Sequence, residues 1–146
     1  MRGLAYLLGI VAGFGITLQV GMNSRLRTLL QSANTAALVS FLVGTFALAT
    51  LFVVTRAPVP DRNVISSVPW WAWLGGLMGA FYVAISTVVA SQLGTASLLG
   101  LALSGQLAMA LVVDHFGWLG MPEHPITLTR LAGVALLGFG AWLVAR

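Results

Sequence analysis

Long apolar runs alternate with short polar or proline-containing segments along this chain. Each run is close to the roughly 20 residues that an α-helix needs to cross about 30 Å of hydrocarbon. The five runs cover residues 3–22, 34–55, 70–91, 95–113 and 128–145. The pattern predicts an all-α, polytopic membrane protein whose five transmembrane helices form a single domain over residues 1–146.

The residues between the runs include side chains that begin and end helices. Ser32 or Asn34 can cap the second helix with a side-chain oxygen. Residues 66–69 contain two serines and a proline, which resemble a cap before the first turn of the third helix. Gly94 ends the third helix directly before Thr95 opens the fourth. So short a turn predicts that the third and fourth helices are antiparallel neighbours.

The composition also indicates that lipid surrounds most of this chain. Apolar residues make up 59% of the sequence and charged residues 7%, and the net charge is +4. A soluble domain has about 25% charged residues. All seven cations are arginines scattered along the chain, without the clustered basic face that phosphate binding requires. Nucleic acid is therefore excluded as a partner, and the absence of cysteine excludes disulfides.

Five helices place the two termini on opposite sides of the membrane. The arginines on the N-terminal side are Arg2, Arg56, Arg62 and Arg130, and those on the other side are Arg25, Arg27 and Arg146. This split is too even for the positive-inside rule to fix an orientation, so insertion in both directions is predicted. Two such units related by an in-plane two-fold axis form the inverted repeat of many transporters. An antiparallel homodimer is expected; a parallel dimer or one fixed orientation is the alternative.

Small residues recur at helical spacing on one face of several predicted helices. Such faces let helices approach closely, so their default interpretation is helix packing. The candidate packing residues are Gly9, Gly13, Gly75, Gly79, Gly100, Ser104, Gly133 and Gly140. In the fifth helix this seam is also a candidate for contact with the other subunit.

Four polar side chains lie inside apolar runs: Gln19, Asn23, Tyr82 and Gln106. Burying an amide without a partner costs a few kcal/mol, so each must bond within the protein, with water or with a ligand. Pairing between helices is the structural interpretation of each residue. Convergence of several on one cavity would instead indicate a substrate-binding site, because polar groups in an apolar pocket orient a ligand.

Two hydroxyls and two aromatic rings complete the predicted substrate site. Ser40 and Ser86 can contact a ligand, although a serine in a membrane helix can also bond the carbonyl one turn back. Phe41 and Trp70 are candidates for an apolar wall. Trp70 is also placed as an anchor at the membrane interface, where indole rings gather.

No ionisable side chain lies at the centre of a predicted helix. Proton exchange for a hydrophobic cation needs an intramembrane carboxylate, so that mechanism is not expected. Asp114 and His115, where the fourth helix meets the interface, form either a proton relay or a hydrated helix end. The chain has no paired carboxylates, nucleophile motif or metal-binding set, so neither an enzyme nor a metal or cofactor is expected.

Several spaced motifs resemble the YdcZ family, five-helix bacterial membrane proteins of the drug/metabolite transporter superfamily. The motifs are QVGMN at 19–23, AALVSFLVGT at 36–45, PWWAWLGG at 69–76, GQ at 105–106 and DHFG at 114–117. The resemblance covers essentially the whole chain and implies a multi-pass protein of the bacterial inner membrane, half of an inverted-repeat transporter fold. The positions that match the family's motifs are Gln19, Asn23, Ser40, Trp70, Tyr82, Gln106, Asp114 and His115. The resemblance does not identify a substrate.

These observations favour a secondary transporter of a small neutral, zwitterionic or amphipathic molecule. We expect alternating access at the interface of an antiparallel homodimer, with the lipid bilayer, a second copy of the chain and the small-molecule substrate as partners. A non-transporting membrane subunit or scaffold, or one half of a heterodimeric transporter, is the alternative. A lipid-interacting protein with a groove for acyl chains is a third hypothesis.

Overall fold

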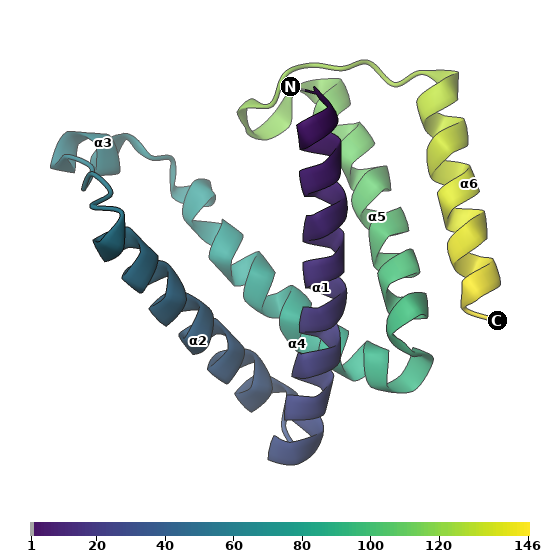
Figure 1. Ribbon diagram of the computed structural model, residues 1–146. Helices are drawn as coiled ribbons and strands as arrows, with labels where there is room; N and C mark the ends of the chain where they lie inside the picture. Colours follow the sequence, from purple (N-terminus) through teal and green to yellow (C-terminus); the bar gives the residue numbers. More distant parts are fainter. Residues whose placement is uncertain (1) are drawn as a thin grey trace. The chain divides into compact units, whose positions relative to one another are not determined.

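The computed structural model describes residues 2–146, and nearly all of its regular structure is helical (Figure 1). The chain divides into two compact units, one ending at Val88 and the other covering Val89–Arg146. The boundary falls inside α4 (Gly75–Leu93), so this helix contributes to both units.

The first unit contains the first two predicted membrane helices and the segment that leads into the third. Its helices are α1 (Arg2–Leu30), α2 (Ala33–Val54), α3 (Arg62–Ser67), the 3-10 helix η1 (Trp70–Leu74) and most of α4. The predicted start of α2 is one residue late, whereas α1 continues to Leu30 instead of ending near residue 22. Polar residues lower the hydropathy after residue 22, but no glycine or proline interrupts the helix there.

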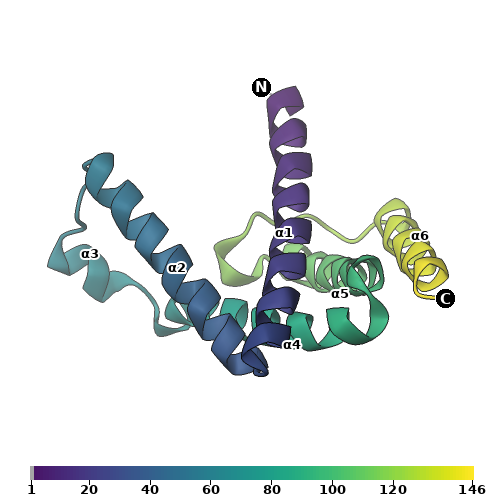
Figure 2. The same cartoon turned by 60° about the horizontal axis from the view of Figure 1, so that its bottom comes forward.

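The turn between α1 and α2 brings these two helices together at one end. Gln31 has a left-handed backbone with φ of 53°, which ends α1. Ser32 is the N-cap of α2, and its hydroxyl accepts a hydrogen bond of 3.2 Å from the Thr35 backbone N–H. Ala36 and Ala37 are buried beside the turn. From this turn the two helices diverge in both views (Figures 1 and 2).

The segment before the third membrane helix differs from its sequence-based prediction. Ser66 and Ser67 do not cap a following helix, because their hydroxyls donate back to the carbonyls of Asn63 and Val64 within α3. Pro69 instead precedes the 3-10 helix η1, and regular α-helix begins only at residue 75. A serine hydroxyl can bond a carbonyl one turn back, and at Ser66 and Ser67 this local bond forms in place of the expected cap.

The second unit is built on an antiparallel helix pair, α5 (Thr95–Phe116) and α6 (Leu128–Val144), with the short 3-10 helix η2 (Trp118–Gly120) between them. A Cβ atom added to Gly100 would lie 3.0 Å from the Cβ of Ala141, so the two backbones approach closely there. Near the same end of the pair, the Ser97 hydroxyl donates to the Val144 carbonyl at 3.4 Å. Small residues therefore allow the close contact expected of such seams.

Four helical segments are long and apolar enough to cross a membrane within the described part of the chain: Gly3–Leu30, Ala33–Val54, Trp70–Leu93 and Thr95–Phe116. The fifth predicted span, Leu128–Val144, is also an apolar helix but has only 17 residues. Large apolar side chains along these helices are exposed, as at Phe46 and Val53. Such surfaces are suited to contact with lipid. Lipid offers no water to hydrogen-bond with backbone groups, but within a helix these groups already bond to one another.

Candidate functional site

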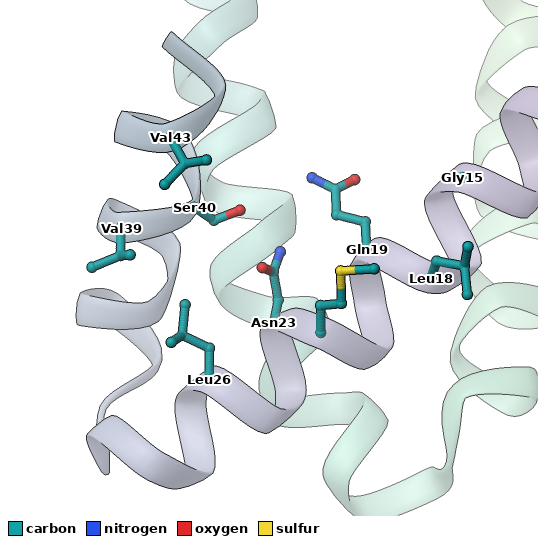
Figure 3. Close-up of a pocket in the computed structure, with 9 residues that line it drawn as sticks. Gly15, Leu18, Gln19, Asn23, Leu26, Val39, Ser40 and Val43 are labelled. Atoms are coloured by element: carbon teal, nitrogen blue, oxygen red, sulfur yellow. The ribbon is translucent and has the colours of Figure 1, made fainter. Parts of the chain in front are cut away.

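A groove between α1 and α2 is the candidate site of the first unit (Figure 3). Its volume is about 510 Å³, which falls within the roughly 300–1,000 Å³ typical of small-molecule pockets. The residues that line it are Gly15, Leu18, Gln19, Met22, Asn23, Leu26, Val39, Ser40 and Val43. The lining is therefore apolar apart from two carboxamides and one hydroxyl.

The three polar side chains of the groove come from two helices and face one another. Gln19 and Asn23 are four residues apart on α1, so they share a face of the helix one turn apart. Ser40 lies on α2, and Figure 3 shows its hydroxyl directed toward the two carboxamides. The sequence pattern singled out all three residues, and the structure places them around one cavity.

None of these three groups forms a hydrogen bond with another described residue. Several other hydroxyls on the same helices are satisfied locally; the Thr17 hydroxyl, for example, donates to the Gly13 carbonyl at 3.0 Å. The Ser24 hydroxyl of α1 is buried without a hydrogen-bond partner in the described chain, but it does not line the groove. Of the three groove residues, Asn23 has the greatest need of a hydrogen-bond partner, because only 5% of its surface is exposed. A buried amide without a partner costs free energy, so water or a ligand has to satisfy it.

Charges around the groove have one sign. Arg25 and Arg27 follow Asn23 within the next turn of α1. Asp61 is the only acidic residue in the sequence up to Val88, and it precedes α3 outside the groove lining. The groove therefore offers no carboxylate that could form an ion pair with a cation.

Two other predicted site residues of the first unit make contacts within the protein. The ring of Phe41 lies 3.4 Å from the position of a Cβ atom on Gly79 of α4, so Phe41 packs on that glycine and does not line the groove. Ser86 is buried and donates a hydrogen bond of 3.0 Å to the Val83 carbonyl, which is the local alternative expected for a membrane serine.

The remaining predicted substrate residues lie outside the groove lining. Tyr82 is half-buried on α4, and Trp70 is 75% exposed at the start of η1, as a residue at a membrane interface can be. Gln106 is exposed on α5 and belongs to the second unit. Their roles in substrate binding stay predictions.

Asp114 and His115 take part in a polar network that fastens the α5–α6 loop. Asp114 forms an ion pair with Arg130 of α6, and the Arg130 guanidinium also donates to the His124 carbonyl at 2.9 Å. The His124 N–H donates to the Asp114 carbonyl at 2.8 Å, and the His115 Nδ1 accepts from the Ile126 N–H at 3.3 Å. These bonds hold the loop to the helix ends, and a proton relay stays a prediction.

The predicted packing residues fall into two groups. Gly79 and Gly100 lie against Phe41 and Ala141, and the Ser104 hydroxyl donates to the Gly100 carbonyl at 2.8 Å. The others have no described heavy atom, outside their own helix backbone and chain neighbours, within 4 Å of an added Cβ: Gly9, Gly13, Gly75, Gly133 and Gly140. These five glycines leave open space beside their helices within the described chain.

Sequence reasoning missed the apolar lining of the groove. Gly15, Met22 and Leu26 each lie three or four residues from one of the two carboxamides, and Leu18 lies four residues from Met22, so helical periodicity around Gln19 and Asn23 could have indicated them. On α2, Val43 lies three residues after Ser40, and Val39 lies four residues before Val43. The pattern contains this information only once the orientation of each helix is known.

Comparison with known proteins identifies the family of this chain. The family described as "Putative inner membrane exporter, YdcZ" matches residues 4–143, nearly the full length. The chain belongs to this family. The curated protein "Inner membrane protein YdcZ" of Escherichia coli (strain K12) is 31% identical to it over 143 residues, which cover 98% of this chain and 94% of that protein. No solved structure matches the chain.

Membership of the YdcZ family confirms the resemblance that the spaced motifs indicated. Together with the long apolar helices, it establishes a multi-pass protein of the inner membrane. The family description concerns export, which assigns its members to membrane transport and not to catalysis.

Proposed function

We propose that this chain is a secondary transporter that binds a small neutral, zwitterionic or amphipathic molecule in the α1–α2 groove. The observation that carries the proposal is the convergence of Gln19, Asn23 and Ser40, without hydrogen-bond partners, on a cavity with otherwise apolar walls. Polar groups so placed orient a ligand. The export description of the YdcZ family supports the same conclusion.

The working form that we propose is an antiparallel homodimer, half of an inverted-repeat fold from each copy, as in the drug/metabolite transporter superfamily. The near-even split of arginines supports insertion in both orientations. Open space beside Gly9 and Gly13 supports close approach of another helix to α1. In such a dimer the two grooves would face a shared cavity, and rocking of one subunit against the other would give alternating access.

Transport by reconstituted protein tests the function. Purified protein in proteoliposomes is screened against a panel of small uncharged, zwitterionic and amphipathic compounds, and Asn23→Leu is compared with Asn34→Leu. Asn34 is an exposed carboxamide in the first turn of α2, so it is a matched control for the substitution. We expect flux of at least one compound to fall about tenfold or more in Asn23→Leu alone, because the loss of a buried hydrogen-bonding group costs this much.

Flux that is the same in both variants would remove the groove as the transport site. If no panel compound crosses and the protein stays monomeric in mild detergent, a non-transporting subunit or a heterodimeric partner becomes the better hypothesis.

Single cysteines test dual insertion, since the native chain contains none. Arg25 lies near the end of α1, before α2, and Asp61 lies in the connection that follows α2, so Arg25→Cys and Asp61→Cys mark opposite ends of α2. An antiparallel homodimer predicts that an impermeant thiol reagent labels each site from both sides of the membrane. Labelling of each site from one side only would contradict dual insertion.

A further inference from the structure

We propose that the α1–α2 groove selects an uncharged ligand that combines an apolar body with a carboxamide-like group, one that both donates and accepts hydrogen bonds. This ligand class rests on the proposed function, because it specifies the substrate of the same groove. It separates uncharged compounds from the zwitterions and anions that an amphipathic cavity could also accept.

The polar groups of the groove can both donate and accept hydrogen bonds. A carboxamide has a carbonyl acceptor and an NH₂ donor, and a serine hydroxyl also does both. Gln19, Asn23 and Ser40 therefore present acceptors and donors together, with no described residue occupying them. A ligand amide can satisfy both kinds of group. A carboxylate would leave the two side-chain carbonyls without donors, and an ammonium would leave the NH₂ groups without acceptors.

Asn23 is the least exposed polar side chain of the groove. With 5% of its surface exposed, it has little access to bulk water, and its unpartnered carboxamide opens onto the groove (Figure 3). A site that is built to hydrogen-bond a ligand discriminates strongly against analogues that leave its buried groups unpaired. Asn23 should therefore decide which polar group the groove accepts.

The electrostatics of the groove disfavour charged ligands. The groove lining has no charged side chain, so neither a cation nor an anion recovers the hydration that it loses on entry. Arg25 and Arg27 add a positive potential from the next turn of α1, which opposes a cation further. Arg27 lines a different pocket together with Thr28 and Gln31, so it is not part of this groove.

The apolar walls define the rest of the ligand. Leu18, Met22 and Leu26 come from α1, and Val39 and Val43 come from α2. Their side chains can bury a hydrocarbon chain or ring, and the thioether of Met22 adapts to irregular shapes. The volume of about 510 Å³ accommodates a ligand of metabolite size.

Three probes with one carbon skeleton test this assignment: 3-phenylpropanamide, 3-phenylpropanoate and 3-phenylpropylamine at pH 7. The thermal unfolding midpoint of the purified full-length protein in detergent is measured against the concentration of each probe, since a ligand that binds the native state raises it. We expect the amide to bind at least about tenfold more tightly than the acid or the amine, the discrimination expected when buried groups are left unpaired.

Asn23→Leu should abolish the shift caused by the amide, whereas Asn34→Leu should keep it. If Asn23→Leu does not fold, Gln19→Leu removes the neighbouring carboxamide from the exposed part of the same helix face. Equal or tighter binding of the acid or the amine, a shift that survives in the groove variant, or no shift with any probe would overturn the ligand class.

Flux measurements with the same probes separate this inference from the proposed function. An amide that binds through Asn23 without crossing the membrane of proteoliposomes would retain the ligand class and contradict the transporter. Transport of the amine or the acid through a groove that depends on Asn23 would retain the transporter and contradict the ligand class.

Discussion

The α1–α2 groove and the α5–α6 pair treat their polar side chains in opposite ways. Along the α1–α2 groove, Gln19, Asn23 and Ser40 have no hydrogen-bond partner among the described residues. Along the α5–α6 pair, the hydroxyls of Ser97 and Ser104 both donate to backbone carbonyls. A polar group without a hydrogen-bond partner destabilises a fold. The unpartnered groups of the groove therefore mark the place where the protein keeps hydrogen-bonding capacity for another molecule.

The cavity between α5 and α6 illustrates the same contrast. It has a volume of about 290 Å³, and Ser104 is the one residue in its lining with a polar side chain. Because the Ser104 hydroxyl already donates to the carbonyl of Gly100, this cavity has less free hydrogen-bonding capacity than the α1–α2 groove. We interpret the α5–α6 pair as a packed scaffold and the α1–α2 pair as the ligand-binding part.

Gly100→Ala should give the largest loss of stability, because the added Cβ would lie 3.0 Å from the Ala141 Cβ and 3.3 Å from its Cα. Forcing atoms into so tight a contact costs about 1–3 kcal/mol in the free energy of unfolding. Thermal or denaturant unfolding in detergent measures the change. Gly105→Ala on the same helix meets no described atom within 4 Å, so this control should be neutral or more stable. Equal effects at both positions would contradict close packing in the second unit.

Asn23→Leu should have the opposite sign. Replacing a buried carboxamide that has no partner with an apolar side chain of similar size removes a desolvation cost, and we expect a gain of about 1 kcal/mol in the free energy of unfolding. The same variant should lose substrate binding. A clear loss of stability, measured by the same unfolding assay, would show that Asn23 is a structural hydrogen-bonding residue, and the contrast between the α1–α2 groove and the α5–α6 pair would disappear.

Asp114→Asn should lower the free energy of unfolding by about 1 kcal/mol or less, because the ion pair between Asp114 and Arg130 is partly exposed to solvent. The unfolding assay measures this loss, and limited proteolysis of the α5–α6 loop reports on its attachment. Substrate flux should stay within about twofold of the native value if Asp114 only fastens the loop. A flux that falls tenfold while stability is kept would instead favour the proton relay with His115.

Gly79→Ala should produce the smallest effect. The new Cβ would meet the Phe41 ring at 3.4 Å, which is ordinary van der Waals contact, and alanine favours a helix by up to about 1 kcal/mol over glycine. Because 3.4 Å is at the short end of the van der Waals range, the contact offsets part of the gain in helix propensity, and we expect a change of about 0.5 kcal/mol or less in unfolding free energy. A large loss would show that α2 and α4 pack as tightly as α5 and α6 do.

Much of the fold can be predicted from the sequence because lipid imposes a simple rule on it. Runs of about 20 apolar residues predict helices, and Ser32 and Gly94 mark helix boundaries in the structure as well. The short helix α3 could not be predicted from hydropathy, since its six residues are mostly polar and belong to a connection. The end of α1 was placed too early because hydropathy falls before the helix ends.

The candidate site could be predicted only in part. Gln19 and Asn23 stand out because amides are rare in apolar helices, and their four-residue spacing fixes a shared face. The location of Phe41 against Gly79 depends on how α2 and α4 are rotated, which no pattern within one helix determines. Whether a polar group lacks a partner is likewise a property of the packed structure.

Gly94 has a consequence for mutational tolerance. It is exposed and is the single residue between α4 and α5, and its N–H donates to the Ala90 carbonyl while its carbonyl accepts from the Leu98 N–H. Its φ of 83° and ψ of 158° lie in a region that is essentially restricted to glycine. Ranking positions by solvent exposure would class residue 94 among those that tolerate substitution. Yet every replacement there strains the backbone of the single residue that connects two membrane helices.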